Sequence, residues 1–119
     1  MNTASRVLLA LLLTSALFTS GCNYAKPIMY VHVANRSGHS MENLEVKYPT
    51  GSFGLPELRD LQTHRRMVPM GTPCKFSIVF EDQTGKKYAE DYDLGPKCPS
   101  EIEFAIGPAM KITKNTLRP

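Results

Sequence analysis

Hydrophobic and polar residues alternate in several short runs along the chain from residue 28 onward. Residues 44–48 (LEVKY), 76–80 (FSIVF) and 101–106 (EIEFAI) place an apolar side chain at every second position. Residues 28–33 (IMYVHV) are similarly rich in β-branched and large apolar side chains. A period of two is typical of a strand with one buried face, so these runs predict β-strands.

Further strands are predicted from weaker patterns. Residues 82–85 (DQTG) form a hairpin loop that leads into a return strand at 86–92, with Tyr88 and Tyr92 on one face. Residues 63–68 (THRRMV) and 110–113 predict two more short strands.

The segments between the strands are rich in turn residues. Residues 35–38 (NRSG) form a turn, and residues 49–54 are expected to be a turn-rich loop around Phe53. Residues 58–62 are compatible with one helical turn or a loop. We expect a globular unit over residues 28–114 and a frayed tail over 115–119.

Seven or eight short strands with turns between them predict an all-β fold. The spacing favours a small antiparallel β-sandwich that is immunoglobulin-like in architecture, with a small β-barrel as the alternative. The chain has no tryptophan. It therefore lacks the core tryptophan of a true immunoglobulin domain.

The first 21 residues have the organisation of a signal peptide. Arg6 supplies a positive start, a 12-residue apolar run covers 7–18, and small residues precede Cys22. A membrane-spanning helix needs about 20 apolar residues, so this run is the length of a cleaved leader.

Ser20, Gly21 and Cys22 resemble the lipobox of bacterial lipoprotein precursors, although Thr19 stands where that pattern usually has an aliphatic residue. The resemblance implies cleavage before Cys22 and lipidation of its thiol and amine. Residues 22–27 would then be the lipidated residue and a short tether to a membrane. Asn23 in place of aspartate implies the outer membrane, facing the periplasm. An ordinary secretory leader, with Cys22 in a disulfide, is the alternative.

Lipidation of Cys22 leaves Cys74 and Cys98, an even number in an oxidising compartment. A disulfide between them would close a loop worth about 3 kcal/mol. Free thiols and a metal site are the alternatives, but no CxxC motif or suitably spaced histidine accompanies either cysteine.

Length and charge limit the function. The 119 residues carry 14 basic and 11 acidic side chains, a net charge of +3. One domain is expected, and the charge is too weak and too dispersed to indicate nucleic-acid binding.

No pattern in the chain indicates an enzyme or a cofactor. The three histidines occur without a metal-protease, nucleophile-elbow or phosphate-loop motif. His64, Met67 and Met70 are weak candidates for a copper site, because thioether and imidazole groups suit Cu(I). Methionine is also a common core residue, so packing in the core is the alternative explanation for these methionines.

Residues 33–54, together with residues 80–88, also resemble small, uncharacterised bacterial lipoproteins in their turn and strand residues. This resemblance implies the sandwich but no activity. We therefore expect a non-enzymatic envelope module, structural or protein-binding. A ligand- or metal-binding lipoprotein is the alternative.

A protein partner would bind loops far from the tether. Because arginine and aromatic side chains dominate most interfaces, the candidate contacts are Arg36, then Phe53 and Arg59.

Overall fold

The computed structural model describes residues 27–119, which form eight strands and one short 3-10 turn. The strands are β1 (Ile28–Asn35), β2 (Met41–Tyr48), β3 (Gly51–Leu58), β4 (Thr63–Pro69), β5 (Lys75–Glu81), β6 (Lys87–Asp93), β7 (Glu101–Ile106) and β8 (Ile112–Arg118). The 3-10 turn, Pro108–Met110, lies between the last two strands. Within the described residues, no helix is long and apolar enough to cross a membrane.

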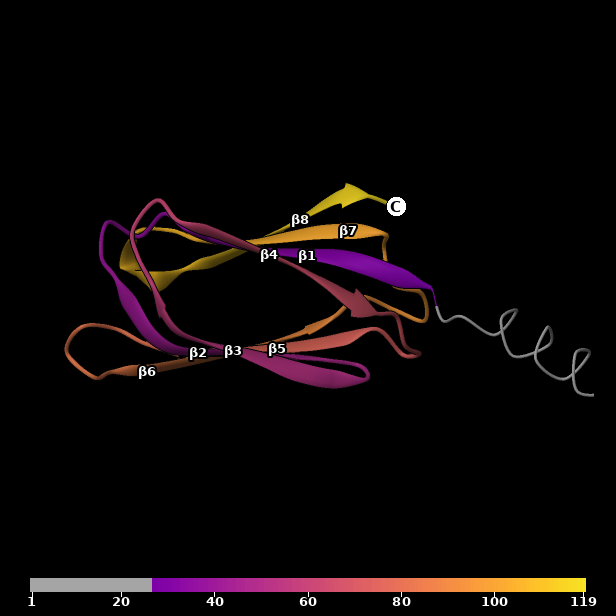
Figure 1. The fold of residues 1–119 in the computed structure, drawn as a ribbon, viewed down its shortest axis with the longest axis horizontal. Helices are drawn as coiled ribbons and strands as arrows, with labels where there is room; N and C mark the ends of the chain where they lie inside the picture. Colours follow the sequence, from indigo (N-terminus) through magenta and orange to yellow (C-terminus); the bar gives the residue numbers. More distant parts are fainter. Residues whose placement is uncertain (1–26) are drawn as a thin grey trace, which may run out of the picture.

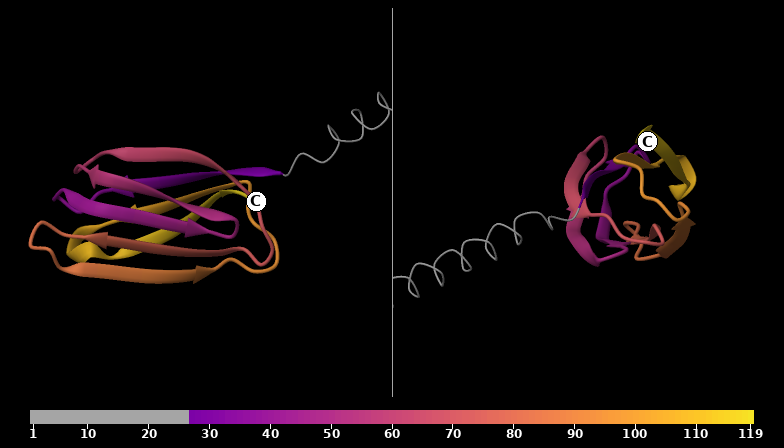
Figure 2. Two further views of the ribbon diagram at one scale, coloured as in Figure 1. Left: turned by 60° about the horizontal axis from the view of Figure 1, so that its bottom comes forward. Right: turned by 90° about the vertical axis from the view of Figure 1, so that its right-hand side faces the viewer.

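The strands form two four-stranded sheets packed face to face, as Figure 1 shows. Sheet A has the order β4-β1-β7-β8, and sheet B has the order β3-β2-β5-β6. All neighbours are antiparallel except β1 and β7, which are parallel. The predicted small β-sandwich is confirmed, and the alternative of a closed barrel is wrong (Figure 2).

The alternation seen in the sequence builds the core. Met29, Val31 and Val33 of β1 and Phe76, Ile78 and Phe80 of β5 all point inward and are almost fully buried. In β2 the buried Met41 and Leu44 are three residues apart, because the pairing with β5 shifts register between Glu42 and Glu45. A bulge of this kind brings the next apolar residue back to the inner face.

A cluster of aromatic rings joins the sheets across the core. The ring of Phe104 on β7 lies 5.5 Å from that of Phe76 on β5 and 5.1 Å from that of Tyr92 on β6, measured between centroids. The rings are tilted at 47–48°, a favourable geometry for aromatic pairs.

The predicted disulfide joins Cys74 to Cys98, with the two Cα atoms 5.1 Å apart. Cys74 lies just before β5, and Cys98 lies in the connection between β6 and β7. The bond therefore fastens the connection that crosses from sheet B to sheet A.

Two of the predicted boundaries are wrong. Residues 49–54 are not one long turn: only Pro49 and Thr50 lie between β2 and β3, and Phe53 is inside a strand. The tail is not frayed, since β8 runs to Arg118 in antiparallel pairing with β7. Ser100 Oγ also donates a hydrogen bond to the Pro119 carbonyl at 3.0 Å. Residues 58–62 form the end of β3 and a turn.

Candidate functional site

The sandwich has two distinct ends, because the strands run along its length (Figure 1). The chain enters β1 at Ile28, at the end that also holds the β2–β3, β4–β5 and β6–β7 connections and the C-terminus. We call this the tether end. The β1–β2, β3–β4, β5–β6 and β7–β8 connections lie at the opposite, distal end.

Two loops of the distal end, residues 36–40 and 59–62, are joined through Asn35 and form what we call the distal tip. Asn35 is completely buried. Its amide nitrogen donates to the carbonyls of His39 at 2.7 Å and Leu58 at 2.8 Å. Its amide oxygen accepts from the backbone nitrogen of Ser37 at 3.0 Å and from the Ser37 hydroxyl at 2.7 Å. One side chain thus satisfies groups in both loops.

Backbone hydrogen bonds reinforce this junction. The Leu61 nitrogen donates to the Asn35 carbonyl at 2.7 Å, and the Asn35 nitrogen donates to the Gln62 carbonyl at 2.9 Å. The Gly38 nitrogen donates to the Asp60 carboxylate at 2.9 Å. The two loops are therefore held as one preorganised surface.

Leu61 has the most unusual conformation at the distal tip. Its φ angle is +65°, in the left-handed region that is costly for a branched apolar residue. Its side chain is 82% exposed, the most exposed large apolar side chain of the described residues. Strained residues that the surroundings hold in place occur often at functional sites. We therefore take Leu61 as the centre of the candidate site.

Two of the predicted partner contacts lie at the distal tip, and the third does not. The side chains of Arg36 and Arg59 are 57% and 76% exposed, and each is 3.5 Å from a glutamate, Glu103 and Glu57 respectively. The prediction for Phe53 is wrong: this ring is only 5% exposed, because it lies on the inward face of β3. It packs against Tyr48 and His64.

Sequence reasoning missed Leu61. Residues 58–62 were compatible with both a helical turn and a loop, and the loop leaves this leucine in solvent. The available signal was that Leu61, between Asp60 and Gln62, is the one apolar residue of positions 59–62.

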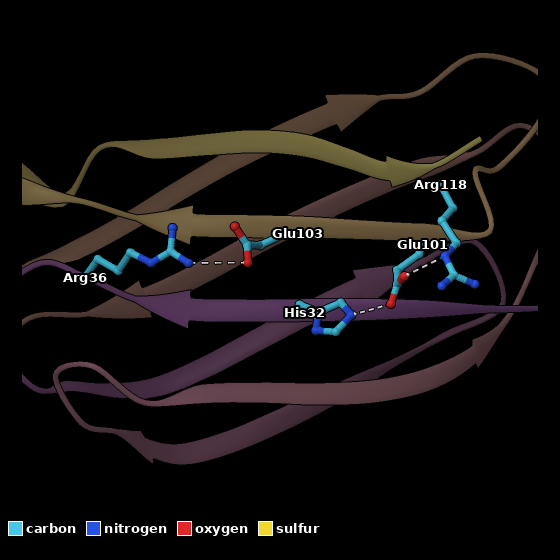
Figure 3. Close-up of polar contacts among 5 residues, drawn as sticks. All are labelled: His32, Arg36, Glu101, Glu103 and Arg118. Atoms are coloured by element: carbon cyan, nitrogen blue, oxygen red, sulfur yellow. Dashed lines mark hydrogen bonds and ion pairs between the residues drawn. The ribbon is translucent and has the colours of Figure 1, made fainter.

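A second group of polar side chains, which we call the polar ladder, lies on the outer face of sheet A (Figure 3). His32 Nε2 is 2.8 Å from the Glu101 carboxylate, and Arg118 approaches the other oxygen of that carboxylate at 3.5 Å. The hydrogen bond with His32 is the main cause that lowers the pKa of Glu101 below its usual range; the nearby Arg118 and Arg65 contribute. This ladder joins β1, β7 and β8.

The weak copper candidates do not come together. His64 is half-buried against Phe53, whereas Met67 is 59% exposed and three positions along the same strand. Met70 follows β4 at the tether end, about 20 Å along the chain from His64. One ion cannot contact all three in this fold. Burial, followed by the charge of Arg66, lowers the pKa of His64.

Comparisons with known proteins bear on the fold alone. No protein-family model matches the chain, and no curated protein is significantly similar in sequence. Among solved structures, the NMR structure of a protein from Eubacterium rectale is similar with a TM-score of 0.56 and 13% sequence identity. The match covers 79% of this chain and 92% of that chain. At this identity the likeness shows a shared architecture.

Proposed function

We propose that this protein is a non-enzymatic lipoprotein of the bacterial envelope, anchored through Cys22, that presents the distal tip to a protein partner. The observation that carries the proposal is the strained, solvent-exposed Leu61 on loops that Asn35 fixes rigidly, at the end opposite the chain entry. The Ser20-Gly21-Cys22 sequence and the Cys74–Cys98 disulfide support an exported, oxidised protein.

The anchor follows from the chemistry of a cysteine at a new N-terminus. Its thiol forms a thioether to diacylglycerol, and its freed amine accepts another acyl chain. One acyl chain holds a protein only marginally, whereas several chains make attachment durable. The resemblance at Asn23 favours the outer membrane. The distal tip would then point into the periplasm.

The distal tip has features of a small protein-binding surface. Leu61 offers an apolar anchor, and the flanking Arg36 and Arg59 offer cationic, hydrogen-bonding side chains. Arginine is enriched among residues that dominate binding energy. Since the loops are already ordered, binding loses little conformational entropy.

Cell fractionation tests the anchor. Cys22→Ser should leave a precursor or a protein that is released from the membrane fraction. The double variant Cys74→Ala/Cys98→Ala is the matched control, because it removes the other two cysteines and should stay membrane-bound at mature size. A Cys22→Ser protein that remains in the membrane at mature size would refute the anchor.

Photocrosslinking in cells tests the distal tip. A crosslinker at position 61 should capture a distinct protein, and one at the exposed Thr72, at the tether end, should not. Leu61→Ser combined with a crosslinker at position 36 should capture the same protein at least about tenfold less, in keeping with the loss of a central apolar contact. Equal capture from 61 and 72, or none from 61, would count against the proposal.

A further inference from the structure

Exposed apolar side chains gather on one sheet of the sandwich. Among the described residues, four large apolar side chains are prominently exposed, and three of them belong to sheet A: Ile28 (49%), Met67 (59%) and Leu117 (48%). The fourth is Leu61 of the distal tip. Sheet B contributes none to this set.

The strand register brings these three side chains into one band. Met67 pairs across the sheet with Tyr30, Tyr30 pairs with Glu101, and Glu101 pairs with Arg118 beside Leu117. Ile28, Tyr30 and His32 face outward, since the intervening Met29 and Val31 are buried. The Arg65 guanidinium lies 4.1 Å from the centre of the Tyr30 ring. We call this group the tether-end band; it consists of Ile28, Tyr30, Arg65, Met67, Leu117 and Arg118.

The two sheets also differ in charge. The strands of sheet A carry four arginines and lysines against two glutamates. The strands of sheet B carry three lysines against seven carboxylates. The sandwich thus has a cationic sheet and an anionic sheet packed about 10 Å apart, so its two outer faces differ in charge.

We propose that the tether-end band rests on an anionic lipid surface. The proposal rests on the lipid anchor at Cys22 for its setting. Six residues, 22–27, separate the anchor from β1 and span at most about 20 Å, so the band cannot lie far from the headgroups. Ile28 and Met67 would enter the headgroup region, and Arg65 and Arg118 would contact lipid phosphates.

This orientation agrees with the charge and with the proposed partner site. Sheet B, with its excess of carboxylates, faces away from the anionic surface. Arginine and tyrosine suit an interface, since each combines an apolar stem or ring with a polar end. The band lies near the chain entry, so a tilted molecule keeps Leu61 and the rest of the distal tip in the aqueous phase.

Vesicle co-sedimentation tests the band without the anchor. The probe is the chain from residue 22 with Cys22→Ser, which keeps all eight strands and both partners of the disulfide. It should sediment at low salt with vesicles of phosphatidylcholine and phosphatidylglycerol, and not with phosphatidylcholine alone. Arg65→Glu should weaken this binding at least about fivefold, because one basic side chain near an anionic membrane contributes about that factor.

Lys47→Glu is the matched control. It makes the same change in net charge on sheet B, where the Lys47 side chain is 64% exposed, and should leave binding within about twofold. Met67→Ser should weaken binding without any change in charge. Thermal unfolding checks that each variant is folded.

Three outcomes would overturn the proposal: no binding to anionic vesicles, equal weakening by Arg65→Glu and Lys47→Glu, or a protein captured by a crosslinker at position 67 in place of lipid. None of these tests the anchor, because the probe carries no lipid. The Cys22→Ser fractionation described above tests the anchor separately.

Discussion

One buried amide, that of Asn35, holds both loops of the distal tip. Asn35→Ala removes the hydrogen bonds of this amide and leaves the carbonyl of Leu58, which it meets in a buried hydrogen bond, and the partly buried carbonyl of His39 without this donor. We predict a decrease of about 2–3 kcal/mol in the free energy of unfolding, measured by urea denaturation. The control, Asn115→Ala at an exposed position of β8, should change it by less than about 0.5 kcal/mol. Similar effects of the two substitutions would contradict the role given to Asn35.

Two tyrosines on the inner side of β6, Tyr88 and Tyr92, differ in whether the hydroxyl is hydrogen-bonded. The Tyr92 hydroxyl is buried with no hydrogen-bond partner among residues 27–119, and burial, together with the Glu90 carboxylate, raises the pKa of Tyr92 to about 12. The Tyr88 hydroxyl donates to Asp82 at 3.2 Å. Removing an unpaired buried hydroxyl relieves a desolvation penalty, whereas removing a paired one loses a hydrogen bond.

We therefore predict changes of opposite sign for the two tyrosines. Tyr92→Phe should leave stability unchanged or raise it by up to about 1 kcal/mol, and Tyr88→Phe should lower it by about 0.5–1 kcal/mol. Thermal and urea unfolding of the two variants are sufficient to check this. A clear loss of stability in Tyr92→Phe would mean that its hydroxyl has a partner after all.

Among the elements, the central strands had the clearest sequence patterns. The edge strands β4 and β6 were also predicted, whereas the edge strand β3 was taken for a loop. The regular alternation in 76–80 and 101–106 corresponds to β5 and β7, each paired on both sides. β3 contains Gly51, Gly54 and Pro56, which read as turn residues in sequence. At the edge of a sheet, however, a proline leaves no ladder hydrogen bond unmade and glycine is tolerated.

The extent of the last strand, β8, was not predicted, for a related reason. Only the first residue of β8, Ile112, is buried, so the strand has no alternating pattern to detect. Its stability comes from pairing with β7, which is a tertiary contact that local sequence does not reveal. The parallel pairing of β1 and β7, in which Tyr30 lies opposite Glu101, 71 positions further along the chain, is equally invisible to local patterns.

The disulfide acts on the connection between the sheets. Its partners are separated by 24 positions, and the chain-entropy estimate for such a loop is about 3 kcal/mol. We predict that Cys74→Ala/Cys98→Ala lowers the free energy of unfolding by about this amount in urea. A reducing agent should have the same effect on the parent protein and none on the double variant. Equal stability of the parent with and without reductant would contradict this.

The polar ladder predicts how stability depends on pH. The pKa of Glu101 in the folded protein is below its ordinary value of 4.5, chiefly through its hydrogen bond with His32, so the ionised carboxylate adds stability that is fully present above about pH 5. This contribution is lost as the pH falls through the folded-state pKa. We predict that Glu101→Gln flattens the acid side of the stability profile, and that Glu57→Gln, at an exposed position of sheet B, does not. A steeper acid loss in Glu101→Gln would be the contrary result.

At the scale of the whole molecule, the charge of each face depends on which strands share a sheet. Strands 1, 4, 7 and 8 form the cationic sheet and strands 2, 3, 5 and 6 the anionic one, so the two charge groups interleave along the chain. Sequence alone shows only a small, dispersed net charge. The residue types of Arg36 and Arg59 were enough to nominate them as candidate partner contacts. The exposure of Leu61, by contrast, appears only in the structure, where the two loops of the distal tip are joined.

The intact mass of the protein from the membrane fraction tests the central claim, an oxidised sandwich anchored through Cys22, most directly. We predict a chain that begins at Cys22, carries a diacylglycerol and an added acyl chain, and becomes heavier by one pair of hydrogen atoms on reduction. A chain that retains residues 1–21, that begins at another residue, or that has an unmodified Cys22 would contradict the account.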